Sequence, residues 1–336
     1  MDLFFAKRNG FGYRLFFLFF FFVFVFLTAC GNGAGSQKPG GDSSKLSVVA
    51  TIFPEYDWVK NIVGDVENVE ITQLLDNGTD LHSFQPTAED IAKVANCDVF
   101  IYVGGESDEW VEDALKESVN KDMVVINLLE ELGDAVKEEE VIEGMEAEEE
   151  EGEGEEEPEY DEHVWLSLRN TEILCEKIEE GMAKADSEHA DIYKMNAEEY
   201  VGALKDLDQK YEEIVSAAKV KTLLFGDRFP FRYLTEDYGL DYYAAFVGCS
   251  AETEASFETI SFLAKKADEL GLTHIMKIES SDGKLADTII SNTKSKDQKV
   301  LTLNSMQATT SKDVKNGTTY FKVMEDNLKV LEEALS

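Results

Sequence analysis

Cysteine is scarce in this sequence of 336 residues, and the few cysteines form no pattern. They are Cys30, Cys97, Cys175 and Cys249, separated by long and irregular intervals. This spacing excludes a disulfide framework and a zinc site built from cysteine pairs. Cys97 opens an apolar run, so we expect it to be a small buried residue.

Basic residues are also few. The chain has 31 Lys and Arg against 69 Asp and Glu, a formal net charge of −38. A surface of this sign repels a phosphate backbone, so we exclude nucleic acid as a partner. It attracts cations instead.

The motifs of common hydrolases are missing. There is no His-Glu-x-x-His, no Gly-x-Ser-x-Gly and no phosphate-binding loop. We therefore predict that the chain is not an enzyme. A metal-dependent hydrolase with two histidines and one carboxylate stays open as an alternative, with Glu162 or Glu279 as its general base.

The N-terminus has the features of a targeting segment. Three basic residues precede an apolar run, 15–27, which is shorter than the roughly 20 residues a membrane-spanning helix needs. The run ends in Leu27-Thr28-Ala29-Cys30, which resembles a bacterial lipobox. We predict a lipoprotein signal peptide over 1–29, lipidation of Cys30 and a flexible Gly/Ser-rich tether over 30–45. The protein would then be lipid-anchored on the extracytoplasmic face of the cell membrane.

Short apolar runs alternate with segments of helical periodicity through most of the remaining chain. This alternation predicts an α/β fold with two lobes, each a mainly parallel sheet flanked by helices. The expected lobes are 46–186 and 219–336, and one long rigid backbone helix over 187–218 joins them, because apolar residues there repeat every three or four positions. The expected strands are Ser47–Phe53, Val69–Leu75, Cys97–Val103 and Met123–Leu128 in the first lobe, and Thr222–Phe225, Leu240–Val247, His274–Glu279 and Lys299–Leu303 in the second. A closing helix is expected over about 312–335.

A low-complexity acidic stretch interrupts the first lobe. Fourteen glutamates and no Lys or Arg lie between Glu138 and Glu159. We expect a disordered loop over about 133–160, because like charges repel and there is little apolar surface to pack. It could collect divalent cations weakly, or only raise solubility.

Two of the four histidines have unusual surroundings. His82 lies in the strand-to-helix loop Gly78–Pro86, and His163 follows the acidic stretch in Asp161-Glu162-His163-Val164-Trp165-Leu166-Ser167. Neutral imidazole is a common metal donor. We predict that His82 and His163 meet in a cleft between the lobes, where ligands bind in such sheets. His189 is expected at a helix start and His274 at a strand start.

These motifs carry a resemblance to a known family. The lipobox, Ala50-Thr51-Ile52-Phe53-Pro54, Asp80-Leu81-His82-Ser83-Phe84-Gln85-Pro86 and Asp161-Glu162-His163-Val164-Trp165-Leu166 resemble the metal-binding (zinc/manganese) solute-binding lipoproteins of ABC transporters. The resemblance covers about 45–336. It implies a monomeric receptor that binds Zn²⁺ or Mn²⁺ between two lobes and delivers it to an ABC importer permease. One histidine would come from each motif, and two ligands from the second lobe.

The second lobe departs from the family pattern. Counting back from Tyr238 puts Arg228 where the third metal ligand is expected, so we nominate its neighbour Asp227 instead. The fourth ligand aligns with Asn304, which can coordinate through its amide oxygen. Glu279 could replace either of them, and Glu252 is a further candidate.

Two imidazoles with one or two carboxylates favour Zn²⁺, and Mn²⁺ is the alternative. If Arg228 points into the cleft, its charge weakens cation binding and favours an anionic ligand or a metal complex. A surface adhesin on the same scaffold also stays open, since adhesion requires only an exposed patch.

Overall fold

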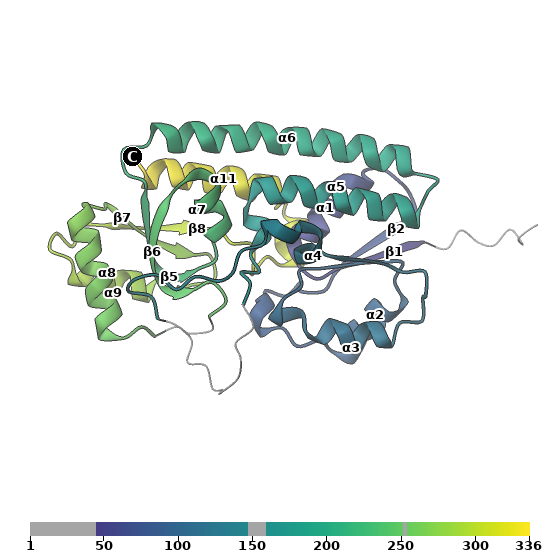
Figure 1. The fold of residues 1–336 in the computed structure, drawn as a ribbon, viewed down its shortest axis with the longest axis horizontal. Coiled ribbons are helices and arrows are strands. Elements are labelled where there is room, and N and C mark those ends of the chain that lie inside the picture. The colour runs from purple at the N-terminus through teal and green to yellow at the C-terminus, as the bar shows by residue number, and fades with distance from the viewer. Residues whose placement is uncertain (1–44, 147–158, 251–253) are drawn as a thin grey trace, which may run out of the picture. The chain divides into compact units, whose positions relative to one another are not determined.

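The computed structural model describes residues 45–146, 159–250 and 254–336 (Figure 1). The predicted signal peptide, Cys30 and the tether up to residue 44 lie outside the described residues. The centre of the acidic stretch (147–158) and Glu252 lie outside them as well. No helix in the described part of the chain is both long and apolar enough to cross a membrane.

The first lobe contains a four-stranded parallel sheet in the order β2-β1-β3-β4. The strands are short runs rich in Val and Ile, and several of their side chains, such as Val48, Phe100 and Ile101, are fully buried. This composition is typical of a parallel sheet covered on both faces. The strand bounds are β1 Leu46–Ala50, β2 Val69–Gln73, β3 Val99–Tyr102 and β4 Val124–Asn127.

Five α-helices cover this sheet: α1 Phe53–Val63, α2 Ala88–Asn96, α3 Trp110–Lys116, α4 Leu128–Leu132 and α5 Leu168–Ala185. Side-chain oxygens start several of them. Thr87 accepts a hydrogen bond from the Asp90 backbone N–H at the start of α2, and Ser167 accepts one from Asn170 at the start of α5. These caps satisfy N–H groups that have no partner inside a helix.

The second lobe repeats the arrangement with strand order β6-β5-β7-β8. Its elements are β5 Thr222–Phe229, α7 Arg232–Tyr238, β6 Asp241–Val247, α8 Phe257–Leu270, β7 His274–Ile278, α9 Lys284–Asn292, β8 Lys299–Leu303, α10 Ser311–Lys315 and α11 Tyr320–Ala334. The single closing helix predicted over about 312–335 is wrong. Gly317, with φ +94°, adopts a left-handed conformation that ends one helix before the next begins.

The long backbone helix is confirmed as α6, Ala190–Ala217. Its 28 residues give a length of about 42 Å. It contacts α1 and α5 of the first lobe and α7 and α11 of the second, and Figure 1 shows it passing along both sheets. His189 lies at the N-cap of α6 and His274 at the start of β7, as expected.

The first part of the acidic stretch differs from the disorder expected over about 133–160. Glu139 Oε1 accepts a hydrogen bond from the Cys249 backbone N–H at 3.1 Å, and Glu146 forms a β-bridge with Phe246. The chain therefore crosses here from the first lobe onto the second. The expectation of disorder was wrong for residues 133–146. Composition alone does not reveal that individual glutamates there form specific hydrogen bonds with the second lobe.

Buried polar contacts join the lobes where α11 begins. The Tyr320 hydroxyl donates to the Trp165 carbonyl at 2.7 Å and lies 2.8 Å from Thr171 Oγ1, while the Trp165 indole N–H donates to the Ser305 carbonyl at 2.8 Å. Trp165 and Tyr320 are both almost completely buried. Removing one of these groups therefore leaves its partner buried with no hydrogen bond, because water cannot reach it.

We expect Tyr320→Phe to lower the free energy of unfolding by about 1–3 kcal/mol, because the Trp165 carbonyl loses the closer of its two buried donors and the Thr171 hydroxyl loses a partner. Urea unfolding measures the change. Tyr243→Phe is the control, since Tyr243 is a half-buried residue whose ring packs against Phe262 on the second lobe. Equal stabilities of the two variants would contradict the role assigned to the Tyr320 hydroxyl.

Candidate metal centre

His82 is held in a single helical turn, Leu81–Ser83, that follows β2. The Asp80 carboxylate caps this turn by accepting a hydrogen bond from the His82 backbone N–H at 3.1 Å. Leu81 is buried beside it and fixes the turn to the core. The local sequence Asp-Leu-His therefore supplies a cap, an anchor and the imidazole in three successive residues.

His163 is fixed by the buried apolar turn that follows it in the chain. It immediately precedes Val164–Leu166, whose side chains are all buried, and its own side chain is 0% exposed. Its backbone N–H donates to Asp161 Oδ1 at 2.9 Å. The imidazole of His163 consequently has little freedom to rotate.

The structure brings His82 and His163 together. Their Nε2 atoms are 3.0 Å apart. Each Nδ1 atom faces a hydrogen-bond partner on its other side: His163 Nδ1 lies 2.9 Å from Asp161 Oδ1, and His82 Nδ1 lies 2.8 Å from Ser107 Oγ. Because a carboxylate only accepts, His163 Nδ1 carries a proton and its Nε2 can present a lone pair.

Two facing nitrogen lone pairs at this distance repel unless something positive lies between them. Two nitrogens bound to one tetrahedral zinc ion at about 2.05 Å each lie about 3.3 Å apart. The observed separation of 3.0 Å is within a few tenths of an ångström of that value. The pair is therefore suited to share a metal ion or a proton.

Glu162 supports His82 from the side opposite the cleft. Its Oε1 accepts a hydrogen bond from the Ser107 backbone N–H at 2.9 Å, and its Oε2 lies 3.4 Å from His82 Nδ1. Burial raises the pKa of Glu162, but hydrogen bonds from His82 and Ser107 outweigh it and the pKa lies below its usual value. The carboxylate approaches closely at Gly105, whose φ of +81° and missing side chain leave the necessary space.

Two further donors lie beside the pair. The Cys249 sulfur and one ring nitrogen of each histidine all lie within 4.8 Å of one another, the one such group of metal-binding side chains found among the described residues. Gln307, oriented so that its amide nitrogen donates to Asp80, accepts a hydrogen bond from His163 Nε2 through its Oε1 at 3.0 Å, so a metal ion bound here would take the place of the proton on Nε2. Nitrogen, sulfur and oxygen donors thus converge at this point.

The other predicted ligands have different partners in this structure. Asp227 Oδ2 accepts a hydrogen bond from the Ile278 backbone N–H and joins β5 to β7. Glu279 accepts hydrogen bonds from the backbone N–H and hydroxyl of Ser305. Asn304 Oδ1 accepts from the Met306 backbone N–H at 2.8 Å. The structure does not bring the Asp227 and Glu279 carboxylates into the group formed by the histidines and Cys249.

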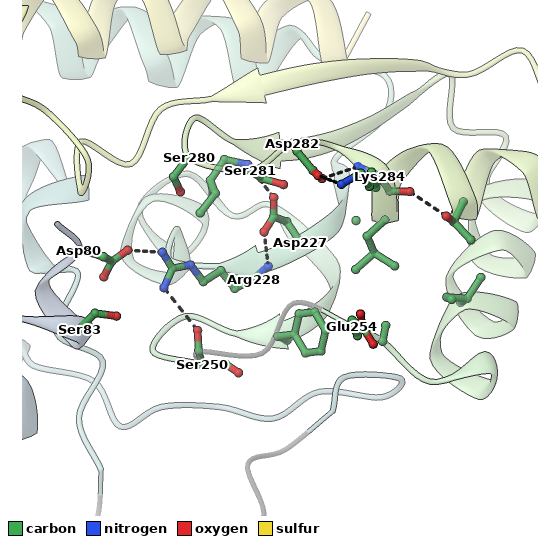
Figure 2. Close-up of a pocket in the computed structure, with 17 residues that line it drawn as sticks. Asp80, Ser83, Asp227, Arg228, Ser250, Glu254, Ser280, Ser281, Asp282 and Lys284 are labelled. Atoms are coloured by element: carbon green, nitrogen blue, oxygen red, sulfur yellow. Dashed lines mark hydrogen bonds and ion pairs between the residues drawn. The ribbon is translucent and has the colours of Figure 1, made fainter. Parts of the chain in front are cut away.

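Arg228 crosses from β5 to the first lobe. Figure 2 shows its guanidinium ion-paired with Asp80 and donating to the Ser250 carbonyl, the latter at 3.3 Å. Its side chain is 14% exposed and lies along a cavity of about 850 Å³ that Asp80, Ser83 and Ser250 also line. The positive charge of Arg228 is therefore paired with Asp80, the carboxylate that caps the His82 turn.

Sequence reasoning did not select Gln307, Ser107 or Cys249 as site residues. Each follows the carboxyl end of a strand, after β8, β3 and β6 respectively. Carboxyl ends of parallel strands meet at one edge of a sheet, so this position was the available signal. Cys249 also follows Gly248, and Gly105 lies two residues before Ser107; glycines of this kind mark places where the backbone comes close to another group.

The fold and the donor group define a two-lobed α/β binding protein with a candidate metal centre between its lobes. Residues 48–334 match the family described as "ZnuA: Zinc-uptake complex component A periplasmic", so the chain belongs to this family. The resemblance inferred from the two histidine motifs is confirmed. The family is a transport component, which confirms that the chain is not an enzyme.

Two curated relatives illustrate the similarity. "Zinc-binding lipoprotein AdcA" of Streptococcus pneumoniae strain R6 is 32% identical over 292 residues, covering 86% of this chain and 56% of the relative. "High-affinity zinc uptake system protein ZnuA" of Bacillus subtilis is 30% identical over 310 residues, covering 91% of this chain and 93% of the relative. The chain thus spans about half the length of the AdcA proteins it matches, 55% for AdcA of Streptococcus pyogenes.

Solved structures show the same fold. The Zn(II)-bound ZnuA-like domain of Streptococcus pneumoniae AdcA aligns with a TM-score of 0.68 and 28% identity, covering 87% of this chain and 99% of that domain. The two-lobe α/β architecture predicted from the sequence is confirmed.

Gly248 controls the approach of β6 to His163. A Cβ atom there would lie 2.9 Å from the Phe229 carbonyl oxygen and 3.0 Å from His163 Cε1. We expect Gly248→Ala to lower the free energy of unfolding by about 1–3 kcal/mol and to displace the His163 ring. The Phe229 carbonyl belongs to the backbone of β5, so it cannot move away from the new methyl group without distorting the strand. Urea unfolding and the NMR resonances of the His163 ring measure the two effects.

Gly202→Ala is the matched control, because a Cβ at Gly202 in α6 meets nothing within 4 Å. Alanine should stabilise that helix by up to about 1 kcal/mol and leave the His163 resonances unchanged. Unchanged stability and unchanged ring resonances in Gly248→Ala would show that the end of β6 accommodates a methyl group, which contradicts the prediction.

Proposed function

We propose that this protein is an extracytoplasmic receptor that binds Zn²⁺ through His82 and His163 and delivers it to an ABC importer permease. The observation that carries the proposal is the 3.0 Å separation of the two Nε2 atoms, with both Nδ1 atoms engaged on the opposite sides of the rings. This arrangement preorganises two nitrogen donors toward one point and leaves little ordering to be done on binding.

The donors favour zinc over manganese. Imidazole nitrogen suits Zn²⁺, whereas Mn²⁺ prefers sites rich in carboxylate oxygen. The nearest carboxylates, Asp161 and Glu162, are turned to the Nδ1 sides of the rings and orient them. The names of the relatives, zinc-binding and zinc-uptake proteins, support the same ion.

Binding and release require only small movements in this proposal. His163 is fully buried, whereas His82 belongs to a short turn between β2 and α2, so the His82 turn is the part that moves when the ion enters or leaves. Arg228 and Asp80 form an ion pair beside the His82 turn, so the two charges offset each other there. The protein transfers the ion without forming or breaking a covalent bond in a substrate.

The family and the N-terminal sequence support the proposed partner and location. The family is described as a periplasmic component of a zinc-uptake complex, and the pneumococcal relative is named a lipoprotein. A lipid anchor at Cys30 would hold the receptor beside its permease on the extracytoplasmic face of the membrane.

Calorimetric titration of the metal-stripped protein tests the proposal. We expect one saturable Zn²⁺ site with weaker Mn²⁺ binding, and we expect His82→Ala and His163→Ala to abolish it, because each removes one of two preorganised nitrogens. His274→Ala is the control, since His274 opens β7 at the end of the sheet away from the strand termini that form the site. No saturable zinc site, or one unaffected by both substitutions, would refute the proposal.

Asp161 should act through His163. We expect Asp161→Asn to weaken zinc binding by roughly 10–100-fold, because the amide holds the Nδ1 proton less strongly and lowers the basicity of the ring. Asp186→Asn is the matched control, since Asp186 Oδ2 lies 2.6 Å from His189 Nδ1 in the same kind of pair. Similar zinc affinities of the two variants would contradict the orienting role of Asp161.

A further inference from the structure

The histidine pair alone gives a divalent cation no negative charge. Both imidazoles are neutral donors when they bind a metal. The Asp161 and Glu162 carboxylates face the opposite sides of the rings, and the Asp80 carboxylate is paired with Arg228. A buried cation is costly unless an anionic group compensates it. Among the residues that the structure describes, no carboxylate joins the group at the point where the nitrogens converge.

Cys249 lies at this point. Its sulfur belongs to the group in which all donor atoms lie within 4.8 Å of one another. It is a free, half-buried cysteine, so an ion can reach it. Gly248 before it lets the strand end approach the His163 ring, since a Cβ there would lie only 3.0 Å from Cε1. The backbone at 248–249 is thus shaped to bring the sulfur beside the imidazoles.

The surroundings of the sulfur keep it protonated until a cation binds. Burial and the nearby Glu139, Asp161 and Glu162 carboxylates raise the pKa of the Cys249 thiol. A divalent cation held by the two imidazoles offsets this effect, because a coordinating thiol gives up its proton to the metal's charge. The Glu139 side chain is hydrogen-bonded to the Cys249 side chain and is placed to receive that proton.

We infer that Cys249 is the third ligand of the metal site and makes it selective for thiophilic ions, Zn²⁺ over Mn²⁺. The inference rests on the proposed zinc-binding function and adds a thiolate to the two histidines. When the ion binds, the Zn–S bond forms as the S–H bond breaks, and the proton passes to Glu139 or to water. Sulfur discriminates strongly between these two ions, because Mn²⁺ prefers oxygen donors.

Zinc X-ray absorption spectroscopy of the fully reduced wild-type protein tests the ligand directly. We expect one scatterer at about 2.3 Å, the Zn–S distance, in addition to nitrogen or oxygen scatterers at about 2.0–2.1 Å. With Co²⁺ in place of zinc, the protein should show a near-ultraviolet sulfur-to-cobalt absorption that Cys249→Ser abolishes.

Selectivity is measured by competition titrations with Zn²⁺ and Mn²⁺. We expect Cys249→Ser to weaken zinc binding about tenfold or more and manganese binding far less, so that the ratio of zinc affinity to manganese affinity falls. Cys97→Ala is the matched control, because Cys97 is a buried cysteine that begins the segment into β3 and should leave that ratio unchanged. A thermal unfolding curve verifies that each variant is folded.

The outcomes separate this inference from the proposed function. Zinc bound by His82 and His163 with no sulfur scatterer overturns the role of Cys249 and leaves the receptor function standing. A wild-type protein with no saturable zinc site overturns both. If Cys249→Ser fails to fold, the wild-type absorption spectrum alone decides the matter.

Discussion

The hydrogen bond between Asp161 and His163 is the constraint on which the rest of the site depends. It places a proton on His163 Nδ1 and leaves Nε2 as the atom that faces His82. The surrounding core makes this arrangement durable, because His163, Asp161 and the following turn are almost completely buried. Ser107 and Glu162 do the same for His82 from the other side. The carboxylates thus orient the ring nitrogens, and they lie on the Nδ1 sides of the rings, away from the proposed metal position.

The acidic stretch contributes to this architecture through its two ends. Its first part crosses onto β6 and places Glu139 against Cys249, and its last residues lead directly into Asp161. Both ends therefore meet the donor group, and the stretch links the first lobe to the edge of the second. Such a connection explains why Glu139 and Glu146 are half-buried and accept hydrogen bonds from backbone N–H groups, despite a composition typical of solvated sequence.

The fold and the two histidines were predictable from the sequence for a simple reason. Strand alternation, the long helical period and the motifs around His82 and His163 are local signals. The second-lobe donors depend instead on how distant strand ends meet. Asp227 and Glu279 looked like ligands, yet each accepts hydrogen bonds from a neighbouring strand or loop. Gln307 and Cys249 lack a local motif, and only the assembled sheet brings them beside the histidines.

The long helix α6 also determines how such a protein can signal that it is loaded. A continuous helix packed on both lobes resists bending, since a hinge within it would break backbone hydrogen bonds along its 28 residues. Wide closure of the kind seen in two-domain clamps is therefore costly here. We therefore expect the loaded and empty forms of the proposed receptor to differ chiefly in the shape of a few loops, such as the turn that carries His82. A partner that distinguishes the two forms would then recognise the local shape around the site, because the lobes would stay at nearly the same distance.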